Sequence, residues 1–309
     1  MKVSLLCFCS FAVSLISCTA DVEVGKVEWG RDLEKACADA DKSGKPVLVL
    51  FQEVPGCAGC KKFGKEVLSH PQVVEAIETE FEPVLVYNNR PGPDAEILKS
   101  FREPSWNYQV IRFLDSKGKD IIPRKDKVWT TEAVAGRMIE ALRSANRKVP
   151  KYLEALAGRY AARNPDEIAF AMFCFWTGER KLGALEGVLS TEAGWIGGRE
   201  VTHVVYDREV ITLEKLVAQA ASLDCAHKVY VSNKKDQEAL EKSRLKVGVI
   251  DGYRPAKQSD QKKQIYGSRL ENLNLSEVQA TKINAFARTD HATALQWLSP
   301  RQRAKFNKS

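Results

Sequence analysis

Apolar and polar positions form a first series of short strands and helices between residues 29 and 145. Val47–Phe51 reads Val-Leu-Val-Leu-Phe, a run that is typical of a buried strand. The polar-faced helix before it ends at Gly44, since glycine is favoured just after a helix. We expect helices over 32–43, 56–70 and 130–144 and strands over 46–51, 81–88, 109–115 and 119–123, the last two forming a hairpin around residues 116–118.

A second series starts at Pro165, after a basic stretch over 146–150 and a helix within 151–164. Its alternating strands and helices predict an α/β or α+β unit. From Tyr253 onward the pattern is helical, and Ser276 is the expected N-cap of a helix over 276–288. In the second series we expect strands over 167–173, 187–195, 201–207 and 228–232, and helices over 176–185, 212–221 and 236–243.

The length and composition of the chain agree with two globular domains. A chain of 309 residues is long for a single hydrophobic core. Its 47 basic and 40 acidic side chains are interspersed, and no dense run of Lys and Arg alternates with aromatic residues. The net charge of +7 therefore indicates a solvated surface and no nucleic-acid partner.

The N-terminus has the pattern of an export signal. Lys2 precedes an apolar run over 3–16, too short for a stable membrane anchor, and charge returns only at Asp21. The run ends in Leu-Ile-Ser-Cys18, which resembles the lipobox of bacterial lipoproteins and implies lipidation of Cys18. The alternative is simple cleavage near Ala20. We expect a periplasmic or cell-envelope protein whose only membrane contact is a lipid on Cys18.

The eight cysteines divide between this signal and the body of the protein. Three belong to the signal, and five remain, an odd number that argues against a full disulfide framework. A close-spaced pair with scattered single cysteines indicates working thiols. Cys37, within a predicted helix among alanines, is the exception and is expected to be a buried structural thiol. The five are Cys37, Cys57, Cys60, Cys174 and Cys225.

The sequence Cys57-Ala-Gly-Cys60 lies directly after a predicted strand and directly before a helix. Backbone N–H groups at a helix N-terminus stabilise a thiolate, so Cys57 is the expected attacking thiol and Cys60 the resolving thiol. The alternative, half of a zinc site, needs a second ligand pair, and neither the other cysteines nor the four histidines offer CxxC or HxxxH spacing. We expect no metal and no cofactor.

These residues resemble the thioredoxin superfamily over residues 27–145. Val54-Pro55-Gly56-Cys57 is similar to a bacterial subgroup in which the first redox position can carry selenocysteine. Thioredoxins place a cis-proline facing the dithiol, and Gln109 aligns at that position here. Either Pro104 takes its place or the substrate groove is altered.

A second constellation surrounds Cys174. It follows a predicted strand, starts a helix, and is followed by Phe175 and Trp176. The two aromatic rings could enclose a small apolar group beside the thiol, and Glu200 could supply a proton. The arrangement thus indicates a second thiol-based centre.

These motifs resemble the A-type peptide methionine sulfoxide reductases over about a hundred residues, and the resemblance implies a domain over 165–267. In that family the cysteine attacks the sulfoxide sulfur, the aromatic pair holds the methyl group and the glutamate protonates the oxygen. Carried over, Cys174 is the nucleophile, Glu200 the acid, and Phe175, Trp176 and Trp195 bind the substrate. The resulting sulfenic acid needs another thiol. Cys225 is one candidate, the alternative being that it is an ordinary buried thiol.

Several positions depart from the family pattern. Phe173 replaces the glycine before the cysteine, and Trp195 replaces a tyrosine whose hydroxyl helps to bind the oxygen. The loop before the glutamate is nearly absent, and a later tyrosine is replaced near Ala226 or His227. Two alternatives follow, a working reductase and a degenerate fold that binds or docks without turnover.

The expected architecture is therefore an α/β thioredoxin fold followed by an α+β domain like methionine sulfoxide reductase A. The favoured function is an exported thiol–disulfide oxidoreductase coupled to methionine sulfoxide reduction, acting on oxidised proteins with electrons from a membrane thiol donor. The alternatives are a disulfide reductase or isomerase with a non-catalytic binding module, and a lipoprotein scaffold with vestigial thiols. The expected boundaries are a signal peptide over 1–20, domains over 27–145 and 165–267, and a helical tail over 268–309.

Overall fold

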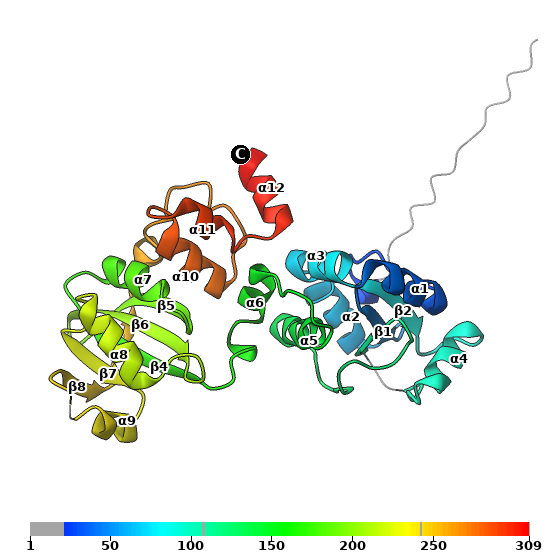
Figure 1. Ribbon diagram of the computed structural model, residues 1–309, viewed down its shortest axis with the longest axis horizontal. Helices are drawn as coiled ribbons and strands as arrows, with labels where there is room; N and C mark the ends of the chain where they lie inside the picture. Colours follow the sequence, from blue (N-terminus) through cyan, green and yellow to red (C-terminus); the bar gives the residue numbers. More distant parts are fainter. Residues whose placement is uncertain (1–21, 107–108, 242, 309) are drawn as a thin grey trace, which may run out of the picture.

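The computed structural model describes residues 22–106, 109–241 and 243–308. Figure 1 shows two lobes, each with its own β-sheet, and helix α6 (Lys151–Ala157) between them. The helices near the C-terminus lie beside the second lobe and extend toward the first (Figure 1). The predicted signal peptide over 1–20 and its Cys18 lie outside the described residues and stay predictions.

The first sheet has the strand order β2-β1-β3. Its strands are β1 (Val47–Gln52), β2 (Glu82–Tyr87) and β3 (Val110–Leu114). β1 pairs parallel with β2 and antiparallel with β3. Every residue of β1 is buried, as expected for a central strand with helices on both faces.

Five helices cover this sheet: α1 (Leu33–Ser43), α2 (Ala58–Glu66), α3 (Pro71–Glu80), α4 (Pro93–Ser100) and α5 (Thr131–Ser144). Successive side chains of a strand point to opposite faces. Leu48 and Leu50 accordingly pack with α2, α3 and α5, whereas Val49 and Phe51 pack with α1 and α4. The unbroken apolar run in the sequence thus reflects two hydrophobic layers.

The helix predicted over 32–43 is confirmed as α1. The side chain of Asp32 accepts a hydrogen bond from the backbone N–H of Lys35 at 2.9 Å, and Gly44 ends the helix with a φ of 69°. The helix predicted over 56–70 is shorter in the structure, where it is α2 and covers only Ala58–Glu66. α3 and α4 were not predicted, and each begins with a proline in its first turn, where the missing N–H costs no hydrogen bond.

The strand predicted over 119–123 is wrong. Only an isolated bridge between Leu114 and Asp120 forms there. Two backbone hydrogen bonds still join the sides of the predicted hairpin, from the Asp115 N–H to the Lys119 carbonyl at 2.8 Å and from the Ile121 N–H to the Phe113 carbonyl at 2.9 Å. The Asp120 carboxylate also accepts hydrogen bonds from the guanidinium of Arg112 at 3.0 and 2.6 Å. Pro123 has no N–H to donate to a neighbouring strand.

The second sheet has the strand order β8-β7-β4-β6-β5-β9 and is antiparallel except for the pair β7 and β8. The short outer strands β8 and β9 were not predicted. Helices α7 (Phe175–Gly183), α8 (Leu213–Ser222) and α9 (Lys234–Ala239) belong to this lobe. The strands are β4 (Pro165–Ala171), β5 (Val188–Ile196), β6 (Arg199–Asp207), β7 (Lys228–Val231), β8 (Lys246–Val249) and β9 (Arg254–Pro255).

Helix α6 extends the core of the first lobe, because Tyr152, Leu153 and Leu156 pack into the cluster that contains α5. After the second sheet, the chain forms α10 (Glu277–Phe286), α11 (His291–Leu295) and α12 (Pro300–Lys308). The predicted N-cap is confirmed, since Ser276 and Gln279 form a reciprocal capping box. Three short 3₁₀ helices cover Val22–Val24, Gly158–Tyr160 and Gln258–Asp260.

The C-terminal helices contact both lobes. α10 packs against α7 and β5, whereas α12 reaches α3, where the Arg301 guanidinium lies 2.6 Å from the Glu78 carboxylate. The side chain of Gln72 in α3 donates to that of Gln279 in α10 at 2.9 Å, and both glutamines are buried. Within the described ranges, no helix combines the length and the hydropathy that a membrane span requires.

Candidate redox centres

The Cys57 thiol lies at the N-terminus of α2, directly after the loop that follows β1. Cys57 is the N-cap residue of this helix, and its side chain is exposed. The backbone N–H of Cys60 is the largest cause that lowers the pKa of Cys57, and the Cys60 thiol and the N–H of Gly59 act in the same direction. The geometry therefore provides the stabilised, accessible thiolate that the sequence predicted.

Cys60 lies one turn further into α2 and is fully buried. Its Sγ is 3.7 Å from the Sγ of Cys57. Burial is the largest cause that raises the pKa of Cys60, to about 12, with a further contribution from the neighbouring thiol. One thiol is thus activated and exposed and the other is protonated and protected, which separates an attacking from a resolving role.

Gln109, at the start of β3, approaches the dithiol from the side. Its Oε1 lies 3.6 Å from the Sγ of Cys60. Among the described residues, Val54–Pro55 is the peptide bond in the cis conformation, so Pro104 does not take the place of the cis-proline of thioredoxins. The structure therefore gives the second alternative from the sequence, a groove in which glutamine faces the dithiol.

Two glutamates near the dithiol were not predicted as site residues. The carboxylate of Glu23, which is buried, accepts a hydrogen bond from the backbone N–H of Gly56 at 2.9 Å and holds the loop before Cys57. Glu53 places a carboxylate oxygen within 4.8 Å of both thiol sulfurs. The loop between Glu53 and Cys57 has no periodicity from which this proximity could be predicted.

Cys174 lies at the corresponding point of the second lobe, after β4 and at the N-cap of α7. Its side chain is half-buried. The carboxylate of Glu200 accepts a hydrogen bond from the backbone N–H of Phe175 at 2.9 Å, so it lies at the start of the same helix. The pairing of β4 with β6 brings Glu200 here across 25 residues of sequence.

Three aromatic side chains lie together at the start of the same helix. The ring centroids of Phe175 and Trp176 are 5.9 Å apart, and those of Phe175 and Trp195 are 5.5 Å apart with an interplanar angle of 84°. Trp195 lies opposite Glu200 in the pair of β5 and β6. The structure therefore brings together the predicted nucleophile, acid and substrate-binding rings.

The departures from the family pattern have structural counterparts. Phe173 is 91% exposed, so its large side chain points away from the aromatic group beside Cys174. Gly197 and Gly198 have φ values of 56° and 77° and form the two-residue turn between β5 and β6. This tight turn replaces the loop that the family has at this point.

Comparison with known proteins gives two kinds of similarity. A family model described as thioredoxin-like matches residues 28–116. This part of the chain is a thioredoxin-like domain. The chain is also similar to curated proteins named peptide methionine sulfoxide reductase MsrA. Their match confirms the resemblance predicted from the motifs around Cys174.

The MsrA proteins are matched over only part of their length. The protein of Cronobacter sakazakii is 37% identical over 99 residues, which is 25% of this chain and 47% of that protein. Those of Vibrio vulnificus and Vibrio parahaemolyticus are 35% and 29% identical and are covered over 35% and 55% of their length. This chain therefore spans between a third and just over half of the curated relatives that it matches.

Two solved structures have weaker overall likeness. DsbH oxidoreductase has 14% identity and a TM-score of 0.32, with 43% of this chain and 94% of that chain covered. Mxr1 from Saccharomyces cerevisiae in an unusual oxidised form has 18% identity and a TM-score of 0.26, with 33% and 81% covered.

The thioredoxin-like domain and the MsrA-like region each contain one further cysteine. Cys225 is fully buried in the core of the second lobe, where burial raises its pKa. This environment favours the ordinary buried thiol over the resolving role. Cys37 is half-buried in α1, and burial raises its pKa as well.

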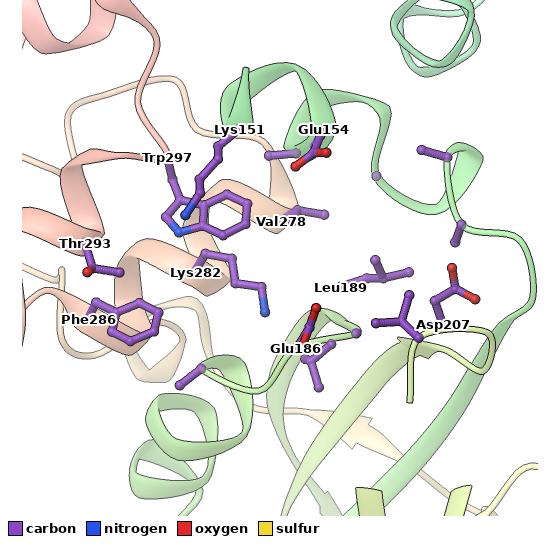
Figure 2. A pocket seen from close by; sticks show the side chains of 18 of the residues that line it. Lys151, Glu154, Glu186, Leu189, Asp207, Val278, Lys282, Phe286, Thr293 and Trp297 are labelled. Atoms are coloured by element: carbon purple, nitrogen blue, oxygen red, sulfur yellow. The ribbon is translucent and has the colours of Figure 1, made fainter. Parts of the chain in front are cut away.

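A separate hollow of about 490 Å³ lies where α6, the second lobe and the C-terminal helices meet (Figure 2). The ammonium groups of Lys151 and Lys282 both face the ring of Trp297, at 5.1 and 5.9 Å from its centroid. The residues that line it include none of the five cysteines of the described ranges. The hollow is therefore distinct from both redox centres.

Proposed function

We propose that this chain is an exported thiol–disulfide oxidoreductase that uses Cys57 and Cys60, and that its MsrA-like region reduces methionine sulfoxide through Cys174. The observation that carries the proposal is the dithiol itself. An exposed Cys57 Sγ with a lowered pKa lies 3.7 Å from the buried Sγ of Cys60. The thioredoxin-like family match supports redox chemistry at this position.

In the direction of reduction, the Cys57 thiolate attacks a substrate disulfide and forms a mixed disulfide, and the second substrate sulfur leaves as a thiolate. Cys60 then gives its proton to solvent water and attacks the Cys57 sulfur, which releases the substrate sulfur bonded to Cys57 as a thiolate. The products are a reduced substrate and a Cys57–Cys60 disulfide, with two electrons transferred. A membrane thiol donor returns these electrons in the proposed cycle.

Reduction of insulin by the purified chain tests this activity, with dithiothreitol as electron source. Cys57→Ser is expected to reduce the rate to that of dithiothreitol alone. Cys37→Ser is the matched control, because it changes a cysteine outside both centres and is expected to retain the rate. An unchanged rate in Cys57→Ser would contradict the proposal.

At the second centre, Cys174 attacks the sulfoxide sulfur while Glu200 transfers a proton to the oxygen. Methionine leaves, and Cys174 is oxidised to a sulfenic acid. A thiol then condenses with the sulfenic acid to give water and a disulfide. Because Cys225 is buried in the core, we assign this thiol to the Cys57/Cys60 dithiol or to an external donor.

Turnover of a methionine sulfoxide peptide with dithiothreitol tests the second activity. It is expected to disappear in Cys174→Ser and to persist in Cys225→Ser. Absence of turnover by the unchanged chain, with insulin reduction intact, would instead support a disulfide reductase or isomerase with a binding module. The exposed Phe173 and the loss of a hydroxyl at Trp195 favour this second candidate.

The proposed location is the cell envelope, with oxidised proteins as substrates. The apolar N-terminal run and Cys18 support export and lipid anchoring. Expression of the full chain in a bacterium tests this, with Cys18→Ser as the variant. The variant is expected to leave the membrane fraction, and equal membrane association of both forms would contradict a lipid on Cys18.

A further inference from the structure

The Glu53 carboxylate and the two thiols of the dithiol form one cluster. One donor atom from each of Glu53, Cys57 and Cys60 lies within 4.8 Å of the other two. Glu53 directly follows β1, Cys57 starts α2 and Cys60 lies inside it, so three adjoining segments contribute. In the part of the chain that the structure describes, the Glu53 carboxylate has neither a hydrogen bond nor an ion pair of its own.

The carboxylate of Glu53 works against the first step of thiol–disulfide exchange. Its negative charge acts on both sulfurs and disfavours the thiolate that attacks the substrate. The helix N-terminus and the carboxylate thus act on Cys57 in opposite directions. When a cation is bound, the carboxylate and the two thiolates all coordinate the same positive charge. The carboxylate then stabilises the bound state instead of disfavouring the thiolate.

The distances suit a tetrahedral ion. Zinc binds thiolate sulfur at about 2.3 Å, which places two sulfurs about 3.8 Å apart in a tetrahedron. The sulfurs of Cys57 and Cys60 are 3.7 Å apart before any metal enters. A carboxylate oxygen needs to be about 3.5 Å from each sulfur, so the half-buried Glu53 side chain has to move by little more than about 1 Å.

We propose that the reduced chain binds one zinc ion through the Sγ atoms of Cys57 and Cys60 and a carboxylate oxygen of Glu53. The exposed side of Cys57 leaves the fourth position open to water or to an external ligand. Binding replaces two thiol protons by one Zn²⁺ and transfers no electrons. A disulfide needs the sulfurs at about 2.05 Å, so closing it excludes the ion. The site is thus restricted to the reduced state.

The sequence did not predict this site, because it offers no second pair of cysteines or histidines at metal-binding spacing. The structure supplies a single carboxylate instead, four residues before Cys57 in an irregular loop. The inference is independent of the reductase activity, since it needs only the two thiols and Glu53.

Titration of the full, reduced chain with Co²⁺ tests the proposal, because thiolate ligands give Co²⁺ an intense charge-transfer absorption. We expect one equivalent to bind and one equivalent of Zn²⁺ to displace it. Glu53→Gln is expected to weaken Co²⁺ binding about tenfold or more. The matched control is Glu66→Gln, which changes an exposed glutamate at the end of α2 and is expected to leave Co²⁺ binding unchanged. Cys174→Ser is expected to keep the absorption, whereas Cys57→Ser and Cys60→Ser lose it.

Absence of the absorption, its persistence in the oxidised chain, or equal affinity in Glu53→Gln would overturn the proposal. Circular dichroism of each variant shows that it is folded. Insulin reduction in the presence of a chelator is measured separately. A chain that reduces insulin and binds no Co²⁺ contradicts only the metal site, and a chain that binds Co²⁺ without reducing insulin contradicts only the proposed reductase activity.

Discussion

The two redox centres share one local arrangement and differ in what surrounds it. In both, a cysteine follows a buried strand and is the N-cap residue of a helix. Cys57 has a second thiol one turn away and a glutamine beside it, whereas Cys174 has a glutamate and three aromatic rings. The position of a thiol at a helix start therefore supplies the nucleophile, and its neighbours decide the reaction.

A resolving thiol is the largest difference between the centres. Cys60→Ser is expected to stop insulin turnover and to accumulate a stable mixed disulfide. The reason is that Cys60 is the thiol that the structure places beside Cys57, where it attacks the mixed disulfide. Cys225→Ser is expected to leave sulfoxide turnover unchanged. Mass spectrometry of the trapped adducts under non-reducing conditions measures both. Accumulation of an adduct only in Cys225→Ser would contradict both expectations and would indicate that Cys225, not Cys60, is a resolving thiol.

The proposed reaction at the second centre needs an acid, Glu200, whereas the carboxylate of Glu53 at the first centre has no proton-donating role in disulfide exchange. Glu200→Gln removes the proton donor and is expected to slow sulfoxide turnover by about a hundredfold or more. Insulin reduction is expected to stay unchanged, since Glu200 lies at the start of α7, in the other lobe from the dithiol. Steady-state rates on the two substrates measure the effect, and a parallel fall in both would indicate loss of folding rather than loss of acid catalysis.

The pH dependence of alkylation sharpens the comparison at Cys57. Its lowered pKa means that the thiolate forms at lower pH than in an ordinary cysteine, so the rate rises with pH and levels off earlier. Because the Glu53 charge raises this pKa, Glu53→Gln is expected to move the midpoint to still lower pH. The pKa of about 12 keeps Cys60 unreactive near neutral pH.

Stopped-flow alkylation with iodoacetamide in metal-free buffer measures these midpoints. The Cys60→Ser variant is expected to move the midpoint of Cys57 upward, because the Cys60 thiol contributes to the lowered pKa. A midpoint in Glu53→Gln at higher pH than in the unchanged chain would contradict the electrostatic role of the carboxylate.

The smallest expected effect concerns stability at a distance from both centres. Ser276→Ala removes the side-chain oxygen of the capping box at the start of α10 and is expected to cost about 1 kcal/mol. Ser276→Thr keeps the oxygen and is the matched control. Chemical unfolding measures the difference, and equal stability of Ser276→Ala and the unchanged chain would show that the cap contributes nothing.

The sequence predicted elements best where the cause is local. The helix α1 has its own caps, Asp32 and Gly44, and β1 is an apolar run that only a strand between two layers can bury. The strand predicted over 119–123 does not form, because the backbone pairing with β3 stops at Ile121 and Pro123 has no N–H with which to continue it. The edge strands β8 and β9 are too short to show a period of two.

By itself, the sequence predicted which cysteines form the two candidate centres. The spacing of Cys57 and Cys60 and their place between a strand and a helix specify an attacking and a resolving thiol, since capping and helix geometry act over a few residues. The aromatic pair after Cys174 is local in the same way.

The motifs already pointed to Glu200 and Gln109, but only the tertiary structure decided how these groups meet the thiols and added Glu53 to them. Strand pairing brings Glu200 to the start of α7 and Gln109 to within 3.6 Å of Cys60, across 25 and 49 residues. An irregular loop turns Glu53 toward both sulfurs. Side chains that meet through strand register and loop conformation leave no periodic trace in the sequence, because their proximity depends on the packing of the whole lobe.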